Sequence, residues 1–228
     1  MEAADSGVRL CQSAARSVYF CYTLVALPLL TLALASYEIA RWLPGVLIWW
    51  AKPWLDRTIL YVLSRAAFGQ RTAPADVWRA QREVWWRGLL FTWTVRRLSP
   101  WRSLTEPVYQ LEGQSLFAAG ARARQIRRHH AGVALLMTSA FSLCEVAITV
   151  ALMSLVFWFA PPGQTPGVAE FLSGDAALLW LVPPAAVALA VLFLEPFYVA
   201  AGFALYLNRR AELEAWDVEQ ELRRAFAR

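Results

Sequence analysis

Residues 131–160 read AGVALLMTSAFSLCEVAITVALMSLVFWFA, and residues 176–207 read AALLWLVPPAAVALAVLFLEPFYVAAGFALYL. Each block holds a single acidic residue and no lysine or arginine. A helix rises about 1.5 Å per residue and needs about 20 mostly apolar residues to cross the hydrocarbon of a bilayer. Both blocks exceed that length, so they predict membrane-spanning helices rather than helices of a soluble core.

A third apolar block, Val18–Ser36, lies near the start of the chain and contains Pro28, which membrane helices tolerate. The stretch Ala33–Leu34–Ala35 resembles a signal-peptide cleavage site, but the apolar run is long for a signal sequence, so a retained span is favoured. Hydrophobic residues make up 58% of the 228-residue chain and charged residues 17%. This composition and the three blocks predict an all-α integral membrane protein with a single membrane domain.

The stretch 45–68 is ambiguous. It is long enough to cross a membrane, but Lys52, Asp56 and Arg57 interrupt it, and charges in lipid are costly. One reading is a broken crossing whose charges face protein or water. The other is an amphipathic segment that lies on the membrane surface.

The distribution of arginine predicts the orientation. Basic residues crowd the region 70–130 and the start of the tail 208–228, whereas the loop Pro161–Asp175 has none. Cytoplasmic loops carry the excess of basic residues, so that loop is expected in the periplasm of a bacterial inner membrane. Arg9 and Arg16 place the N-terminal segment in the cytoplasm, which requires an even number of crossings before the basic region. The prediction is therefore four spans, with both chain ends cytoplasmic.

The basic region interleaves arginine with tryptophan, a mixture typical of the headgroup layer of a membrane. Amphipathic helices that contact anionic lipid are expected here. Binding of single-stranded nucleic acid is the alternative, disfavoured because apolar blocks flank the region. The candidate headgroup contacts are Arg79, Arg82, Trp85, Trp86, Arg87, Arg96 and Arg97.

Glu145 and Glu195 are the acidic residues of the two long blocks. Glu145 is 14 residues from Ala131 and Glu195 is 13 residues from Asn208, and these two ends share one side of the membrane. The carboxyl groups therefore lie at nearly the same depth, about 20 Å along the helices. They are predicted to face each other or a common polar interior. Such groups either order the bundle or form an ion or proton site.

Lys52, Asp56 and Arg57 form a second polar group. Lys52 and Asp56 are four residues apart, so they are expected to pair on one helix face. This polar group is interpreted as structural, with a functional polar site inside the bundle as the alternative.

Several stretches resemble a known family: WAKPWLDR at 50–57, LSRAAFG at 63–69, SPWRS at 99–103, YQLEG at 109–113, EPFYVAAGF at 195–203, LYLNRR at 205–210 and EAWD at 214–217. Together they resemble an uncharacterised family of proteobacterial multi-pass inner-membrane proteins. The tail more loosely resembles the membrane domain attached to some glycerophosphodiester phosphodiesterases. The resemblance implies a helical membrane fold, but not the phosphodiesterase activity, because that chemistry resides in a separate barrel domain.

No nucleotide-binding, hydrolase or zinc motif occurs in the sequence, and its cysteines form no CxxC pair. No cofactor, metal or enzymatic activity is therefore expected. The favoured hypothesis is a membrane subunit or scaffold that holds other membrane proteins. The alternative is a small transporter or channel-like protein that uses Glu145 and Glu195.

Overall fold

The computed structural model describes residues 2–94, 99–114, 116–128, 130–159 and 180–226, and these residues form helices and connecting turns without a strand. The elements are α1 (Glu2–Ser13), α2 (Ala15–Ala35), the 3₁₀ turn η1 (Ser36–Glu38), α3 (Leu43–Ala66), α4 (Pro74–Arg79), the π turn η2 (Arg82–Trp86), α5 (Leu89–Trp93), α6 (Arg102–Leu111), α7 (Leu116–Arg127), α8 (Ala131–Phe159) and α10 (Val182–Phe226). The predicted periplasmic loop, Pro161–Asp175, lies outside the described residues.

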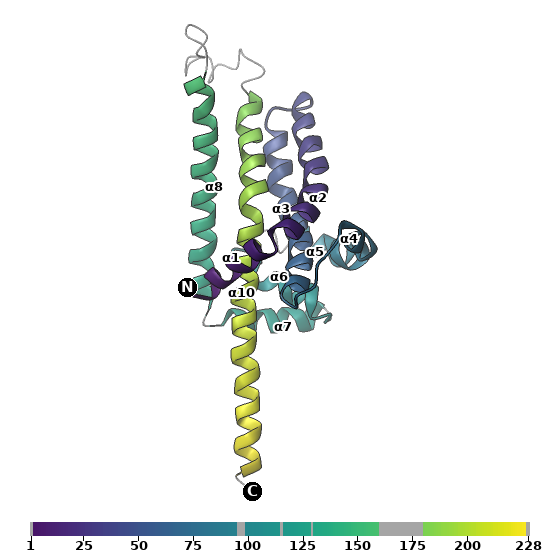
Figure 1. Cartoon of the computed structure of the whole chain (residues 1–228), viewed down its shortest axis with the longest axis vertical. Coiled ribbons are helices and arrows are strands. Elements are labelled where there is room, and N and C mark those ends of the chain that lie inside the picture. Colours follow the sequence, from purple (N-terminus) through teal and green to yellow (C-terminus); the bar gives the residue numbers. More distant parts are fainter. Residues whose placement is uncertain (1, 95–98, 115, 129, 160–179, 227–228) are drawn as a thin grey trace.

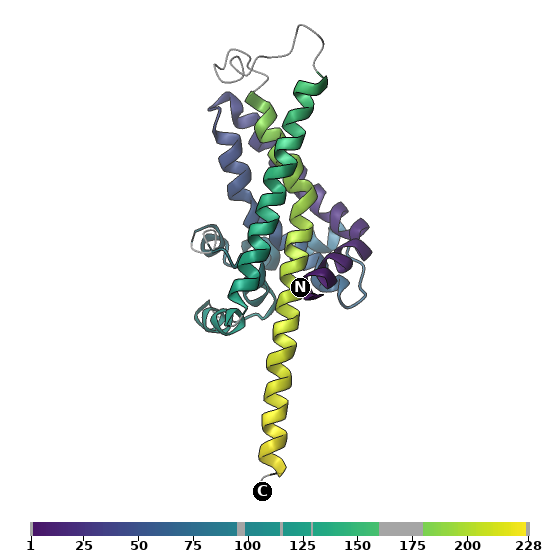
Figure 2. The same cartoon turned by 90° about the vertical axis from the view of Figure 1, so that its left-hand side faces the viewer.

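Four helices, α2, α3, α8 and α10, run side by side along the long axis of the molecule (Figures 1 and 2). Helices long and apolar enough to cross a membrane cover Ala15–Glu38, Ala131–Leu155 and Val182–Ala215. Helix α3 has 24 residues, so its length of about 36 Å also suffices. It carries Lys52, Asp56, Arg57 and Arg65, however, so its composition alone does not mark it as a span. The all-α prediction is confirmed.

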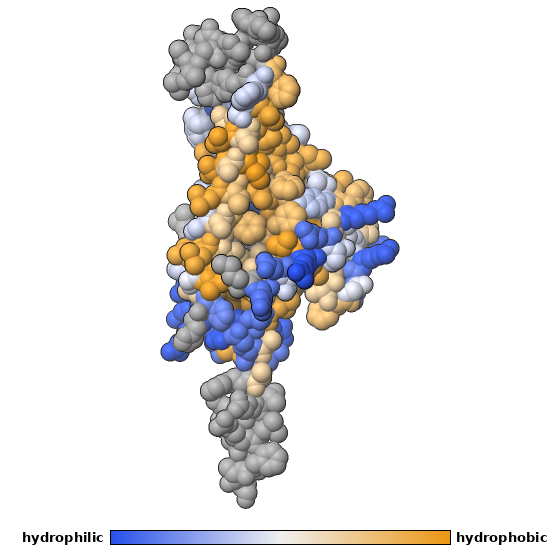
Figure 3. Space-filling view, turned by 60° about the vertical axis from the view of Figure 1, so that its left-hand side comes forward, coloured by the Kyte–Doolittle hydropathy of each residue, from blue (hydrophilic) through white to orange (hydrophobic). Residues whose placement is uncertain are grey.

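The short helices between α3 and α8 surround one end of this bundle (Figure 1). They belong to the basic region predicted to lie at the membrane surface. Apolar residues cover the part of the molecule toward the other end, and hydrophilic residues gather in a band below them (Figure 3). Helix α10 then continues past the short helices, away from the bundle (Figures 1 and 2).

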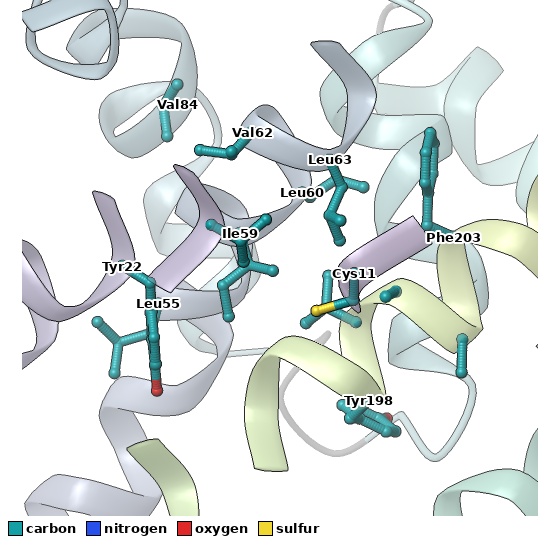
Figure 4. Close-up of a cluster of buried hydrophobic side chains, with 14 of the residues drawn as sticks. Cys11, Tyr22, Leu55, Ile59, Leu60, Val62, Leu63, Val84, Tyr198 and Phe203 are labelled. Carbon is teal, nitrogen blue, oxygen red and sulfur yellow. The ribbon is translucent and has the colours of Figure 1, made fainter. Parts of the chain in front are cut away.

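The apolar core lies between α2, α3 and α10. Leu55, Ile59 and Leu63 recur every four residues along α3 and are fully buried. Tyr22 of α2 and Phe203 of α10 close the core from either side (Figure 4). One face of α3 thus supplies much of this core, and most residues of its central turns are buried.

Glycines allow two close helix crossings with α10. A Cβ atom on Gly7 of α1 would fall within 2.7 Å of the backbone carbon of Ala200, and one on Gly202 would fall equally close to the backbone carbon of Ser103 in α6. Small residues let helix backbones approach each other in this way. The sequence indicated only a short polar segment before the first span, whereas residues 2–13 form α1, which packs across α10.

Helix α8 is the outlying member of the bundle. It packs on α10, and among its described side chains those of Ala134 and Met137 are buried. Most of its apolar residues, including Leu136 and Leu143, are exposed. A helix that is apolar all round and exposed on most sides suits contact with lipid.

Candidate functional site

Lys52 is the centre of an ion-pair network inside the bundle. Its Nζ atom lies 2.6 Å from Oε2 of Glu145 on α8 and 3.0 Å from Oε2 of Glu195 on α10. One ammonium group on α3 therefore connects α3 to both α8 and α10. The side chains of Lys52 and Glu195 are largely enclosed, while that of Glu145 remains partly accessible.

Arg102, the first residue of α6, extends the network to Asp56 of α3. Its Nη2 atom lies 2.8 Å from Oδ2 of Asp56 and 3.1 Å from Oε1 of Glu195. The guanidinium group also lies over the ring of Tyr198. Burial would lower the pKa of Arg102, but the adjacent Asp56, Tyr198 and Glu195 outweigh it and raise the pKa above its ordinary value. Arg102 thus remains a cation that holds two carboxyl groups of different helices.

A second buried pair lies near this network on α3. The Nε atom of Arg57 is 3.8 Å from Oε1 of Glu106 on α6, and Arg57 also donates a hydrogen bond to the carbonyl oxygen of Glu83. Gln110 donates a hydrogen bond to the carbonyl oxygen of Arg57. Both charged side chains are almost completely buried. Helix α6 therefore compensates charges of α3 at Asp56 and again at Arg57.

The expectation that Glu145 and Glu195 face a common polar interior is confirmed, because both bind the ammonium group of Lys52. The expected pairing of Lys52 with Asp56 is wrong: Lys52 binds the two glutamates, and Asp56 binds Arg102. Each of these two residues has its charged partner on a neighbouring helix and not on its own helix face. An ion pair between helices also satisfies both groups without either reaching lipid.

A cavity of about 470 Å³ adjoins the network. Its lining comes from α3, α6, α8, α10 and the turn before α6, and comprises Trp49, Lys52, Ser99, Pro100, Arg102, Thr138, Phe141, Ser142, Glu145, Val146, Leu194, Glu195 and Tyr198. The side chains of Trp49 and Val146 are exposed, so the cavity reaches the apolar flank of the bundle. Thr138 donates a hydrogen bond to the carbonyl oxygen of Pro100, which fixes the turn before α6 against α8.

The charged residues that line this cavity balance, because Lys52 and Arg102 face Glu145 and Glu195. Asp56, which is buried and does not line the cavity, adds a third carboxyl group to the network through its contact with Arg102. The nearby pair of Arg57 with Glu106 is balanced as well. Phe141 and Tyr198 form an edge-to-face aromatic pair in the cavity wall. A carboxylate beside aromatic rings is the chemistry that recognises organic cations.

The candidate headgroup residues divide into different environments. Arg79, Arg82, Trp86 and Arg87 are exposed, as contact with lipid requires, whereas Arg96 and Arg97 lie outside the described residues. The prediction that Trp85 contacts headgroups is wrong, because its side chain is buried between Trp54 and Trp78. Its Nε1 atom donates a 2.9 Å hydrogen bond to Thr58, so its indole packs in the bundle instead of meeting headgroups.

Sequence reasoning missed Arg102 and Glu106, which it left within the basic surface region. Both are buried on α6, together with Leu104 and Val108. The spacing of four residues places each pair on one face of α6, and the offset of two residues places the two pairs on opposite faces. The face of Arg102 and Glu106 would then have offered both charges needed to compensate Asp56 and Arg57.

No family model, curated protein or solved structure matches this chain. The resemblance to a proteobacterial inner-membrane family therefore stays a prediction.

Proposed function

We propose that this chain is a four-span, non-enzymatic protein of the bacterial inner membrane that binds a small cationic ligand in the cavity beside Lys52, as a transporter or channel-like protein. The N-terminal segment and the tail 208–228 are cytoplasmic in this proposal. The observation that carries it is the cavity of about 470 Å³ whose wall includes Lys52, Arg102, Glu145 and Glu195. A charged cavity among apolar helices is expensive to maintain, and such sites in membrane proteins usually serve ions or substrates.

The ion pairs support α3 as the fourth crossing. Lys52, Asp56 and Arg57 each have an oppositely charged partner on another helix. This pairing removes the main objection to placing α3 in lipid, which is the cost of uncompensated charge. It also favours the bundle-crossing reading over an amphipathic segment on the membrane surface.

The accessible carboxylate of Glu145 supports a cation as the ligand. Glu145 is the carboxylate that has one ion-pair partner and remains partly accessible at the cavity. A cation that enters beside it is attracted to this carboxylate, and the attraction is strong in a medium of low dielectric constant. The aromatic rings of Phe141 and Tyr198 provide further favourable contacts for an organic cation.

Ligand entry can be tested with tetraphenylphosphonium and its neutral counterpart triphenylphosphine oxide. The purified protein in detergent should be stabilised against heat by the cation and much less by the neutral molecule. Ser142→Phe, which fills the cavity, should abolish the stabilisation, whereas Leu143→Phe on the exposed face of α8 should retain it. Equal responses to the two molecules, or equal responses of the two variants, would contradict the proposal.

A scaffold or subunit role is the second candidate, favoured by the continuation of α10 beyond the bundle (Figures 1 and 2). A helix that projects from a membrane domain offers a surface for another protein. Removal of residues 216–228 should then release a chain that copurifies in mild detergent, while Ser142→Phe should retain it. Copurification that survives the truncation would contradict a role for this projection.

A further inference from the structure

A second cavity, of about 670 Å³, lies between the α1–α2 junction and the loop after α3. Its lining comprises Ser13, Ala14, Arg16, Ser17, Phe20, Ala66, Gly69, Gln70, Arg71, Thr72, Ala73 and Pro74. Both charged residues of this lining, Arg16 and Arg71, are cations, and no acidic side chain belongs to it. The cavity is therefore positive, in contrast to the one beside Lys52.

The two walls of this cavity are fixed to each other. Ser17 of α2 donates a 2.7 Å hydrogen bond to the carbonyl oxygen of Thr72, which lies 55 residues away in the chain. Gly69 has a φ of 72°, a left-handed conformation that glycine adopts readily, and it turns the chain away from the end of α3. Arg16 and Arg71 thus belong to a preformed site rather than to one flexible segment.

One buried polar atom in the cavity wall lacks a partner. Thr72 is 6% exposed, and its Oγ1 atom forms no hydrogen bond within the described part of the chain. A buried hydroxyl group without a partner costs free energy, which an entering acceptor can recover. Within the described part of the chain, moreover, neither Arg16 nor Arg71 forms an ion pair with an acidic residue, so both guanidinium groups can bind an anion.

The polar and apolar parts of the cavity follow the membrane axis. Arg16 lies in the first turn of α2, at the end of the apolar helix Ala15–Glu38. Phe20 is four residues further along, on the same helix face, and its side chain is exposed. A ligand that bridges both has an anionic head at Arg16 and an apolar chain against Phe20.

We propose that this cavity binds the phosphate-bearing headgroup of an anionic phospholipid, with Arg16 and Arg71 as its cationic ligands. Guanidinium groups bind phosphate oxygens through charge-assisted hydrogen bonds. The hydroxyl group of Thr72 supplies a neutral donor in the wall, and Phe20 contacts the first part of an acyl chain. The site is separate from the exposed arginines Arg79 and Arg82, which face the headgroup layer without such a cavity.

The test measures retention of phosphatidylglycerol by the purified protein in neutral detergent, using native mass spectrometry and a titration of thermal stability. The double variant Arg16→Gln/Arg71→Gln should bind phosphatidylglycerol at least about tenfold more weakly. The matched control, Arg79→Gln/Arg82→Gln, removes the same charge outside the cavity and should change affinity less than about twofold. Thr72→Val, which preserves shape, should weaken binding a few-fold without loss of helix content.

Three outcomes would overturn the proposal. Equal losses in the two double variants would show diffuse attraction to the basic surface instead of a site. Inorganic phosphate that stabilises the protein as well as phosphatidylglycerol does would identify free phosphate as the ligand. Phosphatidylcholine bound as tightly as phosphatidylglycerol would remove the preference for an anionic lipid. Both double variants replace exposed arginines, so they leave the core intact.

Discussion

Helices α8 and α3 differ in a way opposite to what their sequences suggest. Helix α8 is mostly apolar and has Glu145 as its one charged residue, yet its buried side chains are only Ala134 and Met137 among the described ones. Helix α3 carries several charges, yet most of its residues from Ala51 to Leu63 are buried. In this pair of helices, the more apolar one is therefore the more exposed, and the charged one is the more enclosed.

This difference is expected for helices whose surroundings are lipid and not water. Lipid tails are as apolar as leucine, so burying an apolar side chain between membrane helices gains little over leaving it in lipid. A charged side chain gains much from leaving lipid for a partner. Charges therefore determine which face of α3 points inward, and Glu145 is the single charged residue that ties α8 to the network.

The largest effect is expected from removing the cation shared by α3 and α10. Arg102→Met should destabilise the protein by about 3–5 kcal/mol, because it leaves Asp56 and Glu195 buried with one cation fewer. Thermal unfolding in one detergent measures the change. Arg79→Met, which removes an arginine whose side chain is largely exposed, should be nearly neutral. Similar losses in both variants would mean that the buried pairs do not hold the bundle.

Two leucines, one on α3 and one on α8, test the difference in burial between these helices without changing a charge. Leu55→Ala on α3 should cost about 2–5 kcal/mol, since its side chain is fully buried and a cavity remains. Leu143→Ala on α8 should change stability by less than about 0.5 kcal/mol, because its side chain is 71% exposed. If Leu143→Ala proved the more damaging, α8 would have to pack against a partner.

A smaller loss of stability is expected from a substitution at the close crossing of α6 with α10. Gly202→Ala should cost about 1–3 kcal/mol, because the added methyl group collides with Ser103 and moves Arg102 away from its carboxylates. Gly132→Ala on α8 has free space around it and should be neutral or slightly stabilising. Unfolding midpoints of the two variants give the comparison, and equal midpoints would argue against the close crossing.

The smallest effect on stability is expected at Glu145, the residue of α8 that pairs with Lys52. Glu145→Gln should destabilise less than Glu195→Gln does, because Glu145 binds one cation and is partly accessible, whereas Glu195 is enclosed and binds two. Each substitution combined with Lys52→Met should show coupling of about 0.5–3 kcal/mol in a double-mutant cycle. Additive effects for Glu145 would mean that its contact with Lys52 contributes nothing to stability.

The sequence predicted the fold class and part of the site. The blocks that became α8 and α10 are unmistakable by length, and the equal depth of Glu145 and Glu195 followed from helix rise alone. Their common partner did not follow, because an all-round apolar helix does not reveal its rotation about its own axis. Lys52 was assigned to Asp56 since only contacts within one helix can be derived from spacing.

The basic region was the least predictable part. Arginine and tryptophan are enriched at membrane surfaces, so Arg102 and Trp85 had the same sequence signature as the exposed Arg79 and Trp86. What separates them is the tertiary contact: Arg102 meets Asp56 and Trp85 meets Thr58, both on α3. Such contacts depend on how α6 and η2 fold back onto the bundle, which local pattern does not specify.

The central claim is that α3 crosses the membrane with its charges paired inside the bundle. Ile39, before α3, and Phe68, after it, are 81% and 83% exposed, so a cysteine at either position is equally accessible. In a background without the native cysteines, a membrane-impermeant thiol reagent added to intact cells should label Ile39→Cys from the periplasmic side. It should label Phe68→Cys only after the inner membrane is opened. Labelling of both from the same side would place α3 on the membrane surface and contradict this account.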